Sequence, residues 1–352
     1  MLKWIPAELH THTLHSDGKQ TLEELVQSAV DLGLECIAMT DHNTQSALAD
    51  QERVQRQFGL PIISGMEWTT FYGHMLTLGV DRFIDWRVLG PDDIHEGIRQ
   101  VHEQGGIAGI AHPFRIGSPI CTGCFWEYTI QDWHEVDYIE VWSTLMPSIK
   151  RDSQRAFAMW TDLLNQGYRI TAVSGRDWHV SKPDDALPAV TYLGVHDEAE
   201  EREGLAGRAV EAIRHGSVSV TMGPLLTMWA QIKGRENRYH IGECIELTVE
   251  DSLSVTVQLD VEARASHYNL KPQNLRLLLT SSHGICSEIQ IPAQTGEYTL
   301  SLQDPLGKGW IRAELYGCME DCVMMIAFTN PIYMAYTIER LGFGRCQQNK
   351  RT

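Results

Sequence analysis

The spacing of apolar and polar residues changes about two thirds of the way along the chain. Up to about residue 222, short apolar segments alternate with segments whose apolar residues recur every three or four positions. This pattern predicts buried strands followed by amphipathic helices. From about residue 225 onward, apolar and polar residues alternate within short stretches separated by turn residues, as in antiparallel sheets. We therefore predict an α/β domain over residues 1–222, a β-sandwich-like all-β domain over 223–342 and a tail over 343–352.

The first strand–helix–strand unit shows the pattern clearly. Thr21 and Glu24 form a capping box that predicts the start of a helix. Apolar residues then follow one helical face as far as Gly33, where we expect the helix to end. The apolar segment 34–39 runs directly into Thr40-Asp41-His42-Asn43. A strand, a helix and a strand that ends in polar residues is how a β/α barrel begins.

The same alternation continues along the chain. In the first domain we expect helices over residues 44–58, 91–104, 153–165 and 210–214, and strands over residues 60–67, 74–79, 107–111, 138–142, 170–174 and 217–221. In the second domain we expect strands over residues 226–232, 245–249, 253–261, 275–279, 287–291, 298–302, 310–315 and 324–328.

Histidine and acidic residues gather at the expected strand ends. His10 and His12 alternate along an extended segment, so both imidazoles point to one face and can reach one ion. Glu67, a lone acid at a strand end, is suited to bridge two ions. His74 begins its strand, which is an unusual position for a ligand at the end of the barrel where the strands terminate. Imidazole and carboxylate ligands without thiolate suit Zn²⁺, Mn²⁺ or Fe²⁺. The candidate ligands are His10, His12, Asp17, His42, Glu67, His74, His112, Asp177 and His179.

Composition narrows the function further. The chain of 352 residues carries 46 acidic and 29 basic residues and a formal net charge of −17. This balance argues against a nucleic-acid duplex or an anionic membrane as partner. No apolar run is long enough to span a bilayer, and the N-terminus offers no signal peptide, so we expect a cytoplasmic protein. The eight scattered cysteines favour reduced thiols, with metal binding by Cys121 and Cys124 as the alternative.

Five motifs together resemble the PHP (polymerase and histidinol phosphatase) superfamily, over about residues 7–222. They are His10-Thr11-His12-Thr13-Leu14-His15-Ser16-Asp17-Gly18, Thr40-Asp41-His42-Asn43, Gly65-Met66-Glu67, Ala111-His112-Pro113 and Asp177-Trp178-His179. Three others are similar to the CehA/McbA group of metal-dependent hydrolases, which also carries a C-terminal β domain: Ile139-Glu140-Val141-Trp142, Met222-Gly223-Pro224-Leu225-Leu226 and Thr329-Asn330-Pro331-Ile332-Tyr333.

The resemblance implies a distorted barrel of seven β/α units and a centre of two or three divalent ions. On the family pattern, the first ion takes His10, His12, Glu67 and Asp177; the second shares Glu67 and takes His74 and His112; the third takes Asp17, His42 and His179. The chain departs from the family at Arg176, where a small residue is common, and at Ser143, where an asparagine is common. These departures do not change the metal ligands, but they leave the identity of the substrate undetermined.

The leading hypothesis is a metal-dependent phosphoesterase that acts on a small phosphorylated metabolite or nucleotide through a metal-bridging hydroxide. Glu67 and Asp177 would hold the catalytic ions, and Arg115 and Arg176 would clamp an anionic phosphate. For either arginine alone, a surface salt bridge is an equally good interpretation.

Two alternatives stay open. The same centre could hydrolyse a carboxyl or carbamate ester, or the chain could be a non-catalytic metal- or ligand-binding module. The segment 115–137, rich in Gly, Pro, Cys and aromatic residues, is a candidate lid or specificity loop. The β domain could cover the barrel, form a homo-oligomer contact or contribute a wall to the substrate site, and its role cannot be predicted from the sequence.

Overall fold

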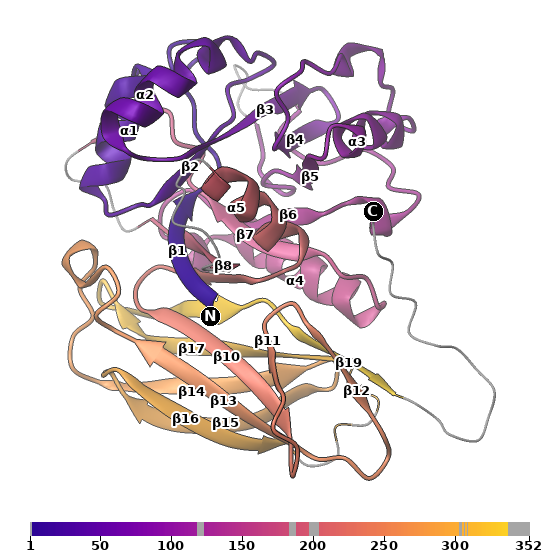
Figure 1. Ribbon diagram of the computed structural model, residues 1–352, viewed down its shortest axis with the longest axis vertical. Helices are drawn as coiled ribbons and strands as arrows, with labels where there is room; N and C mark the ends of the chain where they lie inside the picture. The colour runs from indigo at the N-terminus through magenta and orange to yellow at the C-terminus, as the bar shows by residue number, and fades with distance from the viewer. Residues whose placement is uncertain are drawn as a thin grey trace.

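The structure is a computed structural model that describes residues 2–117, 123–182, 188–196, 204–302, 305, 307 and 309–336. The five α-helices of the described residues lie in the upper half of the molecule, and the lower half is built mainly from strands (Figure 1). The helices are α1 (Leu22–Asp31), α2 (Gln51–Phe58), α3 (Ile94–Glu103), α4 (Arg151–Asn165) and α5 (Leu205–Arg214). Short 3-10 helices cover Ser46–Asp50, Trp86–Val88, Trp133–Glu135, Pro147–Ile149 and Ala265–His267. Among the described residues, no helix combines the length and apolar character needed to cross a membrane.

The upper half is organised around one mixed sheet, in which neighbouring strands follow the order β9-β8-β1-β2-β3-β4-β5-β6-β7. These strands are β1 (Leu2–Glu8), β2 (Cys36–Met39), β3 (Ile62–Thr70), β4 (Gly73–Leu78), β5 (Ile107–Ile110), β6 (Tyr138–Ser143), β7 (Thr171–Gly175), β8 (Val190–His196) and β9 (Val218–Thr221). Strands β1, β2 and β3 are parallel, as are β5, β6 and β7. The capping box predicted for α1 is present, with Thr21 and Glu24 exchanging both hydrogen bonds.

The middle of the sheet departs from a regular β/α repeat. Strands β3 and β4 form an antiparallel hairpin, and β5 is antiparallel to β4. Thr69 near the end of β3 therefore pairs with His74 near the start of β4. A residue that begins β4 consequently lies beside the end of β3, which explains how His74 joins the other candidate ligands. The mixed α/β fold with a large sheet is confirmed, whereas the count of seven β/α units stays a prediction.

Strand β8 is an element for which the sequence pattern gave no prediction. It is antiparallel to β1 on one side and to β9 on the other. Side chains connect it to the far edge of the sheet, because Ser174 N in β7 donates to Thr191 Oγ1 at 2.9 Å and Thr191 Oγ1 donates to Ser174 O at 3.0 Å. These bonds bring β7 beside β8, one strand from the β9 end of this strand order.

The lower half contains every strand expected for the C-terminal third, together with β11 and β19. One sheet has the order β11 (Arg238–His240), β10 (Leu225–Ile232), β13 (Leu253–Asp260), β16 (Gly296–Leu302). The others are β12 (Cys244–Leu247), β14 (Asn274–Ser281), β15 (Gly284–Pro292), β17 (Trp310–Met319), β18 (Cys322–Thr329) and β19 (Ile332–Tyr336). The predicted tail 343–352 lies outside the described residues.

The two halves share both a sheet and a core. Strand β18 pairs with β9, so the sheet of the upper half continues into the lower half. The ring of Phe328 in β18 lies 4.9 Å from Trp142 in β6 and 5.0 Å from Phe157 in α4. Asn330 is fully buried, accepts from Ala172 N at 2.8 Å and donates to Ala172 O at 2.8 Å. Hydrogen bonds and side-chain packing therefore continue across the boundary predicted at residue 222. The division into two domains there stays a prediction.

Candidate metal centre

The loop that follows β1 is held in place by buried polar groups. The Asp41 carboxylate accepts from Thr13 N and Thr13 Oγ1, both at 2.7 Å, and from Ser16 Oγ at 2.6 Å. Gly18 passes so close to the loop that a Cβ atom there would lie 2.5 Å from the His12 carbonyl. Only glycine fits this approach, and the turn it permits brings the side chain of Asp17 back toward the end of β1.

A second set of contacts attaches this loop to the segment after β7. His12 N donates to Trp178 O and Trp178 N donates to His10 O, both at 2.9 Å. The buried Glu8 carboxylate accepts from His10 N at 3.0 Å and from Arg176 N at 2.9 Å. Burial raises the pKa of Glu8 to about 7, although these two backbone donors oppose the rise. The two segments that carry most of the predicted ligands are thereby joined through main-chain bonds.

All of the predicted ligands come together in three groups, in each of which one ligand atom per residue lies within 4.8 Å of the others. The first group is His10, His12, Glu67 and Asp177; the second is Glu67, His74 and His112; the third is His12, Asp17, His42 and His179. Glu67 belongs to the first and second groups, and His12 to the first and third.

The first group contains two histidines and two carboxylates. His10 Nε2 lies 3.2 Å from Glu67 Oε2 and 3.3 Å from Asp177 Oδ1. His12 Nε2 lies 3.4 Å and 3.0 Å from the same two oxygens. Two imidazole nitrogens and two carboxylate oxygens therefore converge on one point, an arrangement that matches a four-coordinate ligand set for a divalent ion.

The second and third groups lie on either side of the first. In the second, His74 Nδ1 is 2.9 Å and His112 Nε2 is 3.3 Å from Glu67 Oε1. The two oxygens of Glu67 thus face different groups, which is the geometry of a bridging carboxylate.

In the third group, His42 Nε2 and His179 Nε2 lie 3.4 Å and 3.0 Å from Asp17 Oδ1. The side chain of Asp17 is 63% exposed and that of His179 is 30% exposed, whereas Glu67 is completely buried. The centre therefore opens to solvent on the side of the third group.

The chemistry of these side chains fits bound cations. Several of their buried polar atoms make no hydrogen bond within the described part of the chain, namely His10 Nε2, His12 Nε2, Glu67 Oε2 and Asp177 Oδ1. Leaving such atoms unpaired costs about 1–3 kcal/mol each. All four point into the first group, so a divalent ion there would satisfy them together.

Backbone geometry supports the same interpretation. His112 and Asp177 both have positive φ angles, of 25° and 54°, which residues other than glycine rarely adopt. Residues held in such conformations cluster at functional sites, where the surrounding structure offsets their cost.

The charges of the centre support one another in the metal-free protein. Burial would raise the pKa values of Glu67 and Asp177, but the histidines around them hold both pKa values well below the usual range. Burial would lower the pKa of His10, but Glu67, Glu140 and Asp177 raise it well above normal. For His179, the hydrogen bond to Asp17 and the charge of Asp177 outweigh burial and raise the pKa to about 8. Protons therefore occupy nitrogens that an ion would need.

Glu140 contacts the candidate ligand His10, although the sequence analysis placed it only in a strand motif. Its Oε2 lies 2.6 Å from His10 Nδ1, and the side chains of both residues are fully buried. A carboxylate behind a ligating histidine fixes the ring orientation and makes the other nitrogen a better ligand. Gly175 leaves room for this pair, because a Cβ there would lie 2.4 Å from Glu140 Oε2. A single acid inside the apolar strand Tyr138–Trp142 was the signal that could have identified it.

The two arginines predicted to clamp a phosphate occupy different environments. Arg115 donates to Asp177 Oδ2 and to Ser143 Oγ, and its side chain is 20% exposed beside the first group. Arg176 is only 7% exposed, and its guanidinium stacks 4.3 Å above the ring of Trp178. This geometry favours Arg115 over Arg176 as a group that could meet a substrate.

Other candidates fall outside the three groups. His15 Nδ1 lies 2.7 Å from Ser46 Oγ and contributes to no group. Cys124 is buried, while Cys121, which precedes it in the predicted CxxC motif, lies outside the described residues. Of the predicted lid, residues 118–122 are likewise not described, but Trp126 N donates to Pro113 O at 2.9 Å and so fixes the later part near the candidate ligand His112.

Parts of the chain are similar to known proteins in sequence and in structure. Residues 8–103 match the model of the PHP domain family, a stretch that ends before His112, Asp177 and His179. An uncharacterized protein of Methanocaldococcus jannaschii is 31% identical over 126 residues, which cover 33% of this chain and 70% of the relative. The 3′,5′-nucleoside bisphosphate phosphatase of Chromobacterium violaceum is 30% identical over 115 residues, 30% of this chain and 40% of the relative.

A third relative, the phosphoribosyl 1,2-cyclic phosphate 1,2-diphosphodiesterase of Eggerthella lenta, is 30% identical over 80 residues, 21% of this chain and 30% of the relative. The chain thus spans less than half the length of the two relatives with named activities. A Bacteroides vulgatus crystal structure, of a two-domain protein containing a predicted PHP-like metal-dependent phosphoesterase, shares the fold: it has a TM-score of 0.52 at 15% identity and covers 94% of this chain and 96% of its own. From the matched family model and the relative covered over most of its length, the chain belongs to the PHP domain family.

Proposed function

We propose that the protein is a metal-dependent phosphoesterase whose reaction takes place at the three ligand groups. The observation that carries the proposal is the bridging position of Glu67, with one oxygen facing each of two adjacent groups. Divalent ions held there would supply Lewis acidity and an activated water for attack on phosphorus. The named activities of the two bacterial relatives, both on phosphate esters, support this class of reaction.

Different residues of the centre would have different roles in this reaction. Glu67 and Asp177 provide the carboxylates of the first group, and Glu140 orients His10 from behind. Arg115 supports Asp177 and brings a positive charge to the edge of the centre. Because guanidinium pairs well with phosphate oxygens, its position favours an anionic ester over a neutral one.

The direction of substrate entry follows from exposure. Asp17 and His179 are the most exposed members of the centre, while the first and second groups lie inside. A substrate would therefore approach past the third group and present its phosphate to the buried groups. We also propose, from the motifs around Trp142 and Asn330, that the chain is a member of the CehA/McbA group with the barrel of that group.

The test compares substrates and variants under the same metal conditions. Protein loaded separately with Mn²⁺, Zn²⁺ or Fe²⁺ is assayed on p-nitrophenyl phosphate, bis(p-nitrophenyl) phosphate and p-nitrophenyl acetate. We expect metal-dependent hydrolysis of one of the two phosphates and its loss in Asp177→Asn. Asp85→Asn is the matched control, since that carboxylate pairs with Arg87 on the surface and should leave activity unchanged.

Two results would contradict the proposal. Hydrolysis of the acetate ester without either phosphate would favour the carboxyl-ester alternative. No hydrolysis of any substrate by protein with measured bound metal would favour a non-catalytic binding module.

A further inference from the structure

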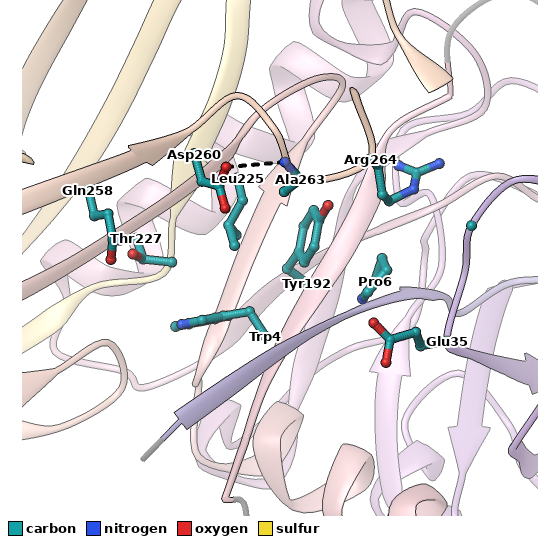
Figure 2. A pocket seen from close by; sticks show the side chains of 11 residues that line it. Trp4, Pro6, Glu35, Tyr192, Leu225, Thr227, Gln258, Asp260, Ala263 and Arg264 are labelled. Carbon is teal, nitrogen blue, oxygen red and sulfur yellow. Dashed lines mark hydrogen bonds between the residues drawn. The ribbon is translucent and has the colours of Figure 1, made fainter. Parts of the chain in front are cut away.

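A cavity of about 330 Å³ lies where β1 and β8 of the upper half meet β10 and β13 of the lower half. None of the residues that line it is a candidate metal ligand. Its volume is within the range of small-molecule sites, which begins at about 300 Å³. Trp4 and Tyr192 face the cavity from β1 and β8, and Asp260 faces it from the end of β13 (Figure 2).

Two aromatic side chains give the cavity flat apolar surfaces. The ring of Trp4 is only partly buried, although it packs against the core of the molecule. The ring of Tyr192 stands between β1 and the loop after β13 (Figure 2).

Two carboxylates, those of Asp260 and Glu35, line the cavity. Asp260 Oδ1 accepts from Glu262 N at 2.9 Å and from Ala263 N at 3.1 Å, and within the described residues the carboxylate makes no ion pair. Glu35 also lines the cavity, where its ion pair with Lys3 is about half exposed and therefore weak.

Among the described residues of the lining, Arg264 is the one cationic side chain, and it is hydrogen-bonded within the protein. Arg264 donates from Nε and from a terminal nitrogen to Leu32 O at 3.1 Å and 2.7 Å. Its guanidinium is turned away from Trp4 and Asp260 (Figure 2), and within the described residues it makes no ion pair with Asp260.

We propose that this cavity binds an organic cation with a flat apolar body, such as an arylamidinium or arylammonium compound. The flat body packs against Trp4, whose ring also attracts a positive charge. The cationic group pairs with Asp260, because a charged hydrogen bond is stronger than a neutral one. The overall charge of −17 favours the approach of a cation.

The position of the cavity gives an occupant a second effect. Trp4 and Pro6 lie on β1, which ends two residues before the candidate ligand His10, whereas Leu225 and Asp260 belong to the C-terminal strands. A bound molecule therefore contacts both halves at once and stabilises the folded protein in proportion to its affinity.

The experiment uses the full chain with benzamidine as the cationic probe and benzamide as its neutral isostere. Binding is measured by calorimetric titration and by the shift in unfolding temperature at increasing probe concentration. We expect benzamidine to bind saturably at millimolar concentration or below, and benzamide at least tenfold more weakly. Asp260→Asn should weaken benzamidine binding at least tenfold while keeping the acceptor oxygen for Glu262 N and Ala263 N.

Two further variants locate the probe. Glu246→Gln changes an exposed carboxylate on β12, away from the cavity lining, and should bind benzamidine like the unmodified protein. Trp4→Leu removes the flat surface and should weaken binding severalfold. The proposal is overturned if benzamidine shows no saturable binding, if benzamide binds equally well, or if folded Asp260→Asn and Trp4→Leu proteins both retain full affinity.

Discussion

Replacing Glu140 tests whether the carboxylate behind His10 tunes the metal centre. Glu140 Oε2 and His10 Nδ1 are 2.6 Å apart and both side chains are fully buried, so solvent does not screen their interaction. Removing such a partner costs about 10- to 100-fold in metal affinity or activity. Glu140→Gln keeps an acceptor for the ring N–H and loses only the charge, so we expect a loss near tenfold. Glu140→Ala also loses the acceptor and leaves a cavity, so its loss should approach 100-fold.

The affinity is measured by competition between the metal-free protein and a coloured chelator for Zn²⁺ or Mn²⁺. Glu135→Gln is the matched control, because Glu135 lies 2.5 Å from His95 Nδ1 in a pair that belongs to none of the three ligand groups. It should leave metal affinity unchanged. If both Glu140 variants fold and bind metal within twofold of the unmodified protein, the assigned role of Glu140 is wrong.

The remaining predictions concern protons, metal release and the contact between the two halves. Because the pKa values of His10 and His179 are raised in the metal-free protein, a binding ion must displace their protons. Metal affinity should therefore rise with pH up to and beyond about 8, by about tenfold per pH unit for each proton released. An affinity that does not change between pH 6 and 8 in calorimetry would contradict this. The exposed third group should lose its ion first during dialysis against a weak chelator, seen as a stepwise fall in metal content by mass spectrometry, whereas simultaneous loss of all ions would argue against three unequal sites. Asn330→Ala removes the bonds to Ala172 N and O and should lower the free energy of unfolding by about 2–4 kcal/mol in urea titration, while exposed Asn237→Ala should change it by less than about 0.5 kcal/mol.

The sequence predicted the candidate ligands because each depends on local information. His10, His12, His42 and Asp177 stand in short motifs at or just after the ends of predicted strands, and parallel strands bring such ends together. The geometric grouping of all the ligands agrees with the family pattern, with His12 additionally close to the third group. Their role as ligands stays a prediction until a metal is bound.

Features that depend on long-range pairing were harder to predict. The position of His74 follows from the β3–β4 hairpin, and the short connection through Phe71 and Tyr72 shows no strong turn signal. Glu140 was missed because its partner His10 lies 130 residues away in the sequence. Nothing local in the C-terminal strands indicates that β18 would extend the sheet through β9.

The most direct test is the location of ions in crystals of the metal-loaded protein by anomalous scattering. The account predicts two buried peaks that share Glu67, separated by about 3.5–4 Å as in other two-metal sites. A third, weaker peak is expected between Asp17, His42 and His179. Metal-loaded crystals with no peak beside Glu67, or with the ions held by other residues, would contradict it.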